Sequence, residues 1–234
     1  MLWRYEITGV DTITLHFGDR IELALTQKVH TATRRLSAEL GNRLIDCAPS
    51  YTSIMLRYDL LQDDLASLMA TVVPILSSLH DTDENEEPPL VNIPVFYHPS
   101  VGPDLERIAG RAGISTEQVI ELHTAQTYHV FAIGFAPGFA YLGEVPKSIA
   151  TPRLATPRQN VPAGSLGIAD TQTAIYPRNS PGGWNIIGRT PLAMFDTRRE
   201  PNSLLQAGQR VRFHPINRDE YLALGGELDG GFAR

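Results

Sequence analysis

Residues 131–190 constrain the fold of this chain more than any other part of the sequence. The segment makes up about a quarter of the 234 residues, and it contains 8 of the 19 glycines and 7 of the 17 prolines. Between them stand aromatic and β-branched residues without a helical period, a mixture that is typical of short strands joined by shaped loops. Proline fixes φ and glycine permits conformations closed to other residues, so such loops can hold one particular shape. We therefore expect them to build a rigid surface.

The same segment is locally cationic, although the whole protein carries a formal charge of −6. Its acids are only Glu144 and Asp170. Its bases are Lys147, Arg153, Arg158, Arg178 and Arg189. A cationic, glycine-rich surface suits a small anion or carboxylate, and ordinary solvated loop charges are the alternative for each base. We expect Arg158 or Arg189 to act as a carboxylate clamp, because a guanidinium can bind a carboxylate through two parallel hydrogen bonds.

Residues 1–80 are predicted to form an α+β domain. The expected elements are strands at residues 4–8, 12–17, 43–48 and 52–58 and helices at residues 23–40 and 62–79. Pro49 and Ser50 are the expected turn between the last two strands, and Pro74 predicts a kink or a break in the second helix. This order indicates helices on one face of a small sheet. The acidic run that follows predicts a flexible linker over residues 81–89, because its like charges repel; docking on a basic partner is the alternative.

Residues 90–234 are predicted to form a second, mainly-β domain. The elements expected around the glycine-rich segment are strands at residues 90–97, 128–133, 192–195 and 210–215 and helices at residues 102–113 and 115–123. Pro94 places the first of these strands at an edge or a bulge, and Ser115 followed by Gln118 is a capping box that opens the second helix. Many short strands with few helices favour a closed or partly closed β-barrel.

Composition and missing motifs exclude several classes of function. No apolar run reaches the roughly 20 residues that cross a bilayer, and the N-terminus lacks the layout of a signal peptide, so we expect a cytoplasmic protein without a membrane partner. A negative net charge argues against nucleic acid as a partner. The single cysteine, Cys47, excludes an internal disulfide. The sequence contains no P-loop, dinucleotide fingerprint, HExxH or paired CxxC motif, so we expect neither an intrinsic ATP site nor a metal site.

Two residues have the chemistry of a catalytic group. His123 ends the capped helix just before the strand that leads into the glycine-rich segment, which makes it the best candidate for a general acid or base. The alternative is a structural histidine at a helix C-terminus. Under the catalytic reading, His123→Ala abolishes activity and leaves the thermal midpoint nearly unchanged. Ser165 lies in AGSLG, close to the G-x-S-x-G nucleophile elbow, but no helix follows it, so we expect Gly164 and Ser165 to offer backbone N–H groups or a loop hydroxyl to an anion instead.

Aromatic residues of the segment are candidates for a pocket or an interface. They are Phe135, Phe139, Tyr141, Tyr176 and Trp184. Their place beside glycine and proline loops favours binding, and core packing is the alternative for each.

Five ordered motifs carry a family resemblance. They are IGFAPGFAYLG at 133–143, TPR at 156–158, VPAGSLGIA at 161–169, QTAIYP at 172–177 and SPGGWNIIGRTPL at 180–192. Together they resemble the family that contains the B subunit of bacterial 5-oxoprolinase, which also includes the sporulation kinase inhibitor KipI. The same family goes by the names allophanate hydrolase subunit 1 and carboxyltransferase subdomain. The similarity runs from about Pro94 to Ile216 and departs from the family pattern at Ala136, Ala140, Asp170 and Ala174.

The resemblance implies a cyclophilin-like β-barrel for residues 90–234. It implies a subunit of an ATP-dependent 5-oxoprolinase that opens 5-oxoproline to L-glutamate, acting with the A and C subunits, inactive without them, and with ATP held by a partner. The residues expected to bind the small carboxylate substrate are Phe135, Pro137, Gly138, Phe139, Arg158, Gly164, Ser165, Gln172, Tyr176, Trp184 and Arg189. Two alternatives stay open: a KipI-like inhibitor of a sensor histidine kinase, or a carboxyltransferase-like protein that acts on a urea-type amide.

Overall fold

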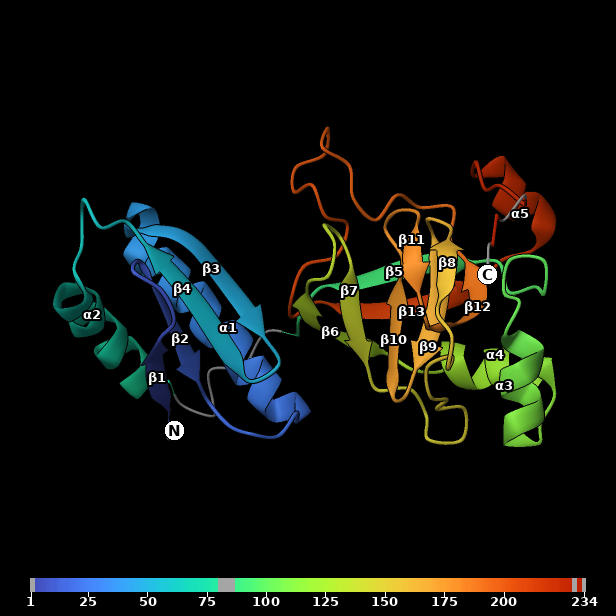
Figure 1. Cartoon of the computed structure of the whole chain (residues 1–234), viewed down its shortest axis with the longest axis horizontal. Helices are drawn as coiled ribbons and strands as arrows, with labels where there is room; N and C mark the ends of the chain where they lie inside the picture. The colour runs from blue at the N-terminus through green and yellow to red at the C-terminus, as the bar shows by residue number, and fades with distance from the viewer. Residues whose placement is uncertain (1–2, 80–86, 229–230, 233–234) are drawn as a thin grey trace. The chain divides into compact units, whose positions relative to one another are not determined.

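The computed structural model describes residues 3–79, 87–228 and 231–232 of the chain. By its internal contacts the chain divides into two compact units, Met1–Glu87 and Pro88–Arg234 (Figure 1). Each unit has a hydrophobic core of its own. Of the acidic linker predicted over residues 81–89, residues 81–86 lie outside the described residues.

The first unit is an antiparallel sheet with two helices packed on one face. Within residues 3–79 the sheet has four strands in the order β1-β2-β4-β3. The elements are β1 (Arg4–Ile7), β2 (Thr12–His16), α1 (Leu23–Leu40), a 3-10 turn (Gly41–Arg43), β3 (Leu44–Ser50), β4 (Ser53–Tyr58) and α2 (Leu65–Ser77). Alternate residues of β2 and β4, such as Leu15 and Leu56, pack against Leu36 of α1 and Val72 of α2. This layered arrangement agrees with the predicted α+β pattern.

Two details of this unit differ from the sequence prediction. Pro49 and Ser50 belong to strand β3 instead of forming a turn, which is possible because β3 is an edge strand and proline lacks only a donor there. The structure shows no break at Pro74, since α2 runs through it to Ser77.

The second unit is built around a sheet that nearly closes into a barrel. Within residues 87–228 the sheet has seven strands in the order β12-β9-β10-β7-β6-β13-β5, and β11 pairs separately with β8. The strands are β5 (Leu90–Val95), β6 (Tyr128–Ile133), β7 (Ala140–Gly143), β8 (Arg158–Val161), β9 (Ser165–Ala169), β10 (Gln172–Ile175), β11 (Ser180–Gly182), β12 (Asn185–Arg189) and β13 (Arg210–Pro215). Phe96, directly after β5, exchanges two main-chain hydrogen bonds with Arg189 at the end of β12, at 2.9 and 3.0 Å. This bridge joins the two ends of the strand order, as the prediction of a partly closed barrel requires.

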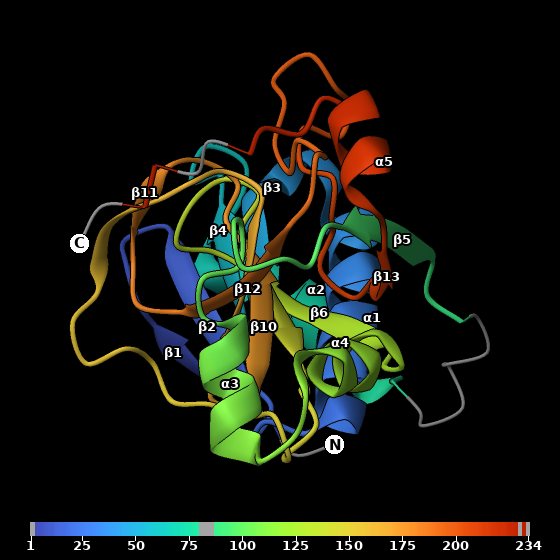
Figure 2. The same ribbon diagram turned by 90° about the vertical axis from the view of Figure 1, so that its right-hand side faces the viewer.

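Three helices accompany the barrel: α3 (Leu105–Ala112), α4 (Thr116–Thr124) and α5 (Arg218–Ala223) among the described residues. Helices α3 and α4 pack against each other, and they also contact β12 and β13 respectively (Figure 2). The predicted capping box of Ser115 and Gln118 opens α4 with both of its hydrogen bonds. The strand predicted at residues 192–195 is wrong, because only Phe195 makes a β-bridge, with Ser203. No helix among the described residues has both the length and the apolar character that crossing a bilayer requires.

Candidate functional site

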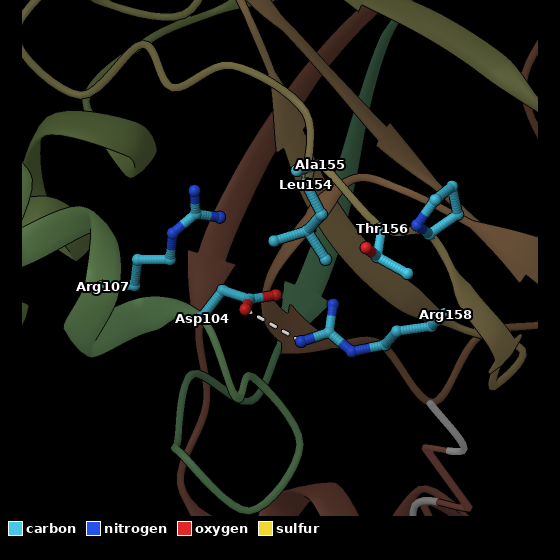
Figure 3. A pocket seen from close by; sticks show the side chains of 7 residues that line it. Asp104, Arg107, Leu154, Ala155, Thr156 and Arg158 are labelled. Carbon is cyan, nitrogen blue, oxygen red and sulfur yellow. Dashed lines mark hydrogen bonds and ion pairs between the residues drawn. The ribbon is translucent and has the colours of Figure 1, made fainter.

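A cavity of about 330 Å³ lies where α3 begins, beside strand β8 (Figure 3). The residues that line it are Asp104, Arg107, Leu154, Ala155, Thr156, Pro157 and Arg158. We call it the Asp104 cavity. Three charged side chains, from two distant parts of the sequence, thus meet around one hollow.

The carboxylate of Asp104 is fixed by two strong hydrogen bonds. Its Oδ1 accepts from Nη2 of Arg158 at 2.8 Å, and its Oδ2 accepts from the main-chain N–H of Ile186 at 2.7 Å. Asp104 stands at the N-cap position of α3 but makes no capping hydrogen bond with its side chain. Only 7% and 10% of the Asp104 and Arg158 side chains are exposed. The ion pair is therefore a buried tie between α3, β8 and β12.

The two arginines of the Asp104 cavity differ in how their donors are used. Arg107 donates through Nη1 to the amide oxygen of Asn185, a buried residue whose own Nδ2 donates to main-chain carbonyls. Arg158 Nη1 is buried and has no hydrogen-bond partner among the described residues. Its guanidinium carbon lies 5.7 Å from the ring centroid of Phe232. An unmet buried donor costs free energy, so this nitrogen is a position that a ligand acceptor would satisfy.

A second cavity, of about 250 Å³, lies beside Gly164, and we call it the Gly164 cavity. Its lining includes Ala163, Gly164, Arg189, Thr190, Tyr221 and Glu227. Gly164 has φ of 79°, and a Cβ atom there would lie 2.4 Å from the carbonyl oxygen of Thr190. Only glycine permits this close approach of the two segments, and it brings the loop before β9 against the end of β12.

Arg189 carries a buried positive charge in the Gly164 cavity. Its Nε donates to the carbonyl of Ala163 at 2.8 Å, and its Nη1 donates to the carbonyl of Glu227 at 3.1 Å. Among the described residues no carboxylate forms an ion pair with it, whereas the charge of Arg158 is neutralised by Asp104. Arg189 is therefore the stronger of the two predicted candidates for binding an anion.

The predicted aromatic residues gather into a cluster around Phe139. Its ring meets those of Phe135, Tyr141, Tyr176 and Trp184 in edge-to-face contacts, with centroids 4.9 to 5.8 Å apart. Phe139, Tyr176 and Trp184 are buried, and burial raises the pKa of Tyr176 to about 12. Phe135, by contrast, is 65% exposed, with φ of 68°. The cluster is thus mainly a small core beneath the loops, from which Phe135 projects into solvent.

The loop after Phe135 is held tightly against a second loop. Pro137 is exposed, and Gly138 has φ of 80°. A Cβ atom on Gly138 would lie 2.9 Å from the carbonyl oxygen of Met194. The APG sequence therefore fixes the position of Phe135 through backbone packing.

His123 lies fully inside the barrel unit. Its Nδ1 is 3.0 Å from the hydroxyl of Tyr97, and its Nε2 is 3.1 Å from the hydroxyl of Thr173. Thr173 donates its own proton to the carbonyl of Gly167, so it accepts from Nε2–H, and Tyr97 donates to Nδ1. Burial lowers the pKa of His123 to about 3, which keeps the ring neutral. The catalytic role of His123 stays a prediction, and its surroundings favour a structural one.

Ser165 and Gln172 begin neighbouring strands. Ser165 opens β9, in which all five residues are buried, and its hydroxyl has no hydrogen-bond partner among the described residues. It is not on a strand-to-helix turn, which is the setting that a nucleophile elbow needs. Gln172 opens β10 opposite Ala169 and Gly143, and it is half-buried.

The predicted residues are thus spread over several places in the barrel unit. Gly164 and Arg189 share one cavity, Arg158 lines the other, and the aromatic residues form a third group. Sequence reasoning missed Asp104 and Arg107 as site residues, because an acid before a helix also suits the helix dipole. Among the described residues, no group of three or more His, Cys, Asp and Glu side chains is arranged to hold a metal ion.

Comparisons with a family model and with solved structures identify the protein family of this chain. A family model described as "Carboxyltransferase domain, subdomain C and D" matches residues 3–205. Among solved structures, TTHA0988 is similar with a TM-score of 0.77 and 34% identity, over 92% of this chain and 40% of that one. PH0987 from Pyrococcus horikoshii has a TM-score of 0.56 and 37% identity, over 93% and 100%. The urea carboxylase of Kluyveromyces lactis shares the fold alone, with a TM-score of 0.69 and 16% identity over 98% and 23%.

Curated relatives then narrow the class. The B subunit of the 5-oxoprolinase of Bacillus subtilis (strain 168) is 38% identical over 95% of this chain and 98% of its own length. The protein of the same name from Escherichia coli O157:H7 is 39% identical over 91% and 95%. The chain therefore belongs to the carboxyltransferase subdomain C and D family, in the group that includes the 5-oxoprolinase B subunits. It spans two fifths of the longer TTHA0988 chain.

Proposed function

We propose that this chain is a component of an ATP-dependent 5-oxoprolinase complex, which opens 5-oxoproline to L-glutamate. The observation that carries the proposal is similarity to curated B subunits over nearly the full length of both chains. Kinase inhibition and action on a urea-type amide are less favoured. The relatives carry the 5-oxoprolinase name, and the likeness to urea carboxylase, at 16% identity, speaks for the fold alone.

Arg189 is the residue that we propose to bind the substrate carboxylate. 5-Oxoproline combines a lactam ring with one carboxylate. The Gly164 cavity combines a small volume with a buried guanidinium that forms no ion pair with a carboxylate among the described residues, although Glu227 also lines the cavity. Two of the five N–H donors of Arg189 hold main-chain carbonyls and so fix the direction of the planar group. In such a partly desolvated place a charge-assisted hydrogen bond is stronger than it is in water.

Partner proteins complete the reaction in this proposal. Opening a stable lactam needs coupling to ATP, and the sequence has no P-loop, so ATP belongs to a partner. His123, the acid–base candidate of the sequence, has both ring nitrogens engaged inside the core. The same fold forms two fifths of the longer TTHA0988 chain, which supports the proposal that this chain functions in association with other protein subunits. We propose the A and C subunits of 5-oxoprolinase as those partners.

Reconstitution tests the function directly. We expect this chain, mixed with the purified A and C subunits, to release glutamate from 5-oxoproline only when ATP is present. Without this chain, glutamate release should fall to background. Full activity of the A and C subunits alone would contradict the proposal, and so would ATP hydrolysis at the full rate by this chain alone.

Arg189→Lys tests the carboxylate clamp. A lysine ammonium cannot reproduce the planar fork, so we expect the KM for 5-oxoproline in the reconstituted complex to rise about tenfold or more. Arg178→Lys is the matched control, because Arg178 is an exposed arginine of the same segment. An unchanged KM and kcat in Arg189→Lys would rule out Arg189 as the clamp while leaving the 5-oxoprolinase assignment intact.

A further inference from the structure

Strand β1 leaves one edge of the N-terminal sheet open. It is the first strand in the order β1-β2-β4-β3, and all four of its residues, Arg4–Ile7, are exposed. Thr8, which follows it, donates its N–H to Thr12 of the neighbouring strand at 3.0 Å. Because hydrogen-bonding direction alternates along a strand, Arg4 and Glu6 also face β2. The N–H and C=O groups of Tyr5 and Ile7 therefore point to the open edge, where the described residues supply no main-chain partner.

The side chains of β1 leave this edge accessible to a matching strand. Tyr5 and Ile7 stand opposite the core residues Leu15 and Ile13, yet they are 46% and 62% exposed. Natural edge strands commonly avoid pairing through proline, a bulge, short length or charged side chains. Strand β1 is short but has no proline, lysine or bulge, and its two charges, Arg4 and Glu6, have opposite signs, so they can pair with a second β1. The opposite edge does have such features, because β3 contains Pro49 and an irregular register between Leu44 and Asp46.

We propose that β1 pairs with β1 of a second copy of this chain, antiparallel, about a twofold axis at Tyr5. Tyr5 then stands opposite Tyr5 of the partner subunit, and Ile7 stands opposite Trp3 of the partner subunit. Arg4 stands opposite Glu6 of the partner subunit, and the symmetry repeats this pair. The new ladder contains about six main-chain hydrogen bonds, and the two sheets become one continuous sheet.

The charges of β1 select this register over its neighbours. A shift by two residues in one direction places Glu6 opposite Glu6 of the partner subunit. The same shift in the other direction places Arg4 opposite Arg4 of the partner subunit. Both oppose like charges directly, which destabilises a strand pair. A shift by one residue turns the wrong main-chain groups to the edge. In the chosen register, Arg4 and Glu6 form the non-hydrogen-bonded pair, where side chains lie closest.

The contact that Glu6 makes within its own sheet does not prevent it from pairing with Arg4 of the partner subunit. Glu6 lies 3.6 Å from Nε2 of His16, but 63% of its side chain is exposed, so its carboxylate can also meet an arginine across the edge. The charge complementarity and the open main-chain groups thus favour the same occupant, a second copy of β1.

The experiment is sedimentation velocity on the full chain and on charge variants of β1. We expect a dimer for the natural sequence. Glu6→Arg and Arg4→Glu should each weaken dimerisation by about tenfold or more, because each opposes like charges twice. The combined variant Arg4→Glu/Glu6→Arg restores opposite charges and should restore the dimer. Glu39→Arg is the control, since it changes the net charge equally on the exposed surface of α1 and should leave the dimer intact.

Ile7→Pro provides a second, independent variant. It removes an N–H that points to the open edge and no hydrogen bond to β2, so it should abolish the dimer with little change in the circular dichroism spectrum. A monomeric natural chain, a dimer indifferent to every β1 variant, or a combined variant that stays dissociated would each overturn the proposal. If the edge instead pairs with a strand of a different protein, the purified natural chain should be a monomer, which is the first of these results.

Discussion

Asp104→Ala is expected to lower the free energy of unfolding of the barrel unit by about 3–5 kcal/mol. The substitution leaves Arg158 as an unpaired charge with a 10% exposed side chain, and it removes the acceptor of the Ile186 N–H. Losing one partner of a buried ion pair is more costly than losing both, because the remaining charge has been taken out of water without compensation.

Urea unfolding measures this loss. The fluorescence of Trp184 should be followed in a Trp3→Phe background, because a chain of two units need not unfold in one step. Glu106→Ala is the control on the same helix, since Glu106 is exposed and should cost only about 0.3–1 kcal/mol as a helix-dipole charge. Asp104→Ala/Arg158→Met should recover part of the loss. If Asp104→Ala were as mild as Glu106→Ala, the pair would not hold α3 to β8 and β12.

The second large effect concerns His123 and pH. Burial lowers the pKa of His123 from 6.5 to about 3 in the folded protein. The unfolded chain therefore takes up a proton first, so this residue contributes its stability fully above about pH 6.5 and loses that contribution as the pH falls toward 3. Between pH 7.5 and pH 4.5 the predicted loss is about 3 kcal/mol, from roughly two pKa units.

A variant that cannot titrate isolates this effect. We expect His123→Asn to show a smaller fall in unfolding free energy than the natural chain between the two pH values, by about 3 kcal/mol, while the other titrating groups cancel in the comparison. His98→Asn is the control, because His98 is exposed. An equal pH dependence in His123→Asn and the natural chain would show that the ring gains its proton without unfolding.

The surroundings of His123 also change what His123→Ala should do. The substitution removes the partner of Tyr97 and Thr173 and opens a cavity beside Phe213, so we expect a cost of about 2–4 kcal/mol at neutral pH. A loss of activity at an unchanged thermal midpoint would instead support a catalytic role for His123.

Local patterns in the sequence predicted much of the fold. The hydrophobic period indicated the bounds of α1, and Gly41, with φ of 50°, follows as the expected stop. The capping box of Ser115 and Gln118 needs only residues three positions apart. Such signals succeed because the interactions that fix these elements lie within one or two turns of the chain.

Contacts between distant residues explain what the sequence could not reveal. Asp104 and Arg158 are 54 positions apart, and nothing local distinguishes this acid from an ordinary helix cap. Residues 192–195 have the apolar character of a strand, yet Met194 fills the core and only Phe195 makes a bridge. Likewise, aromatic residues beside glycine loops are as typical of a binding pocket as of a core. Only the structure shows that Phe139 packs against four other rings and therefore belongs to a core.

Arg189 serves two structures at once. Its main chain forms the rung with Phe96 that joins the first and last strands of the barrel order, while its side chain supplies the positive charge of the Gly164 cavity. In our proposal a substrate carboxylate bound by that guanidinium is therefore tied to the strand pairing that closes the barrel, and the accuracy of its position depends on that pairing. Breaking the main-chain pairing of Phe96 with Arg189 would shift the guanidinium even if every residue that lines the Gly164 cavity were kept.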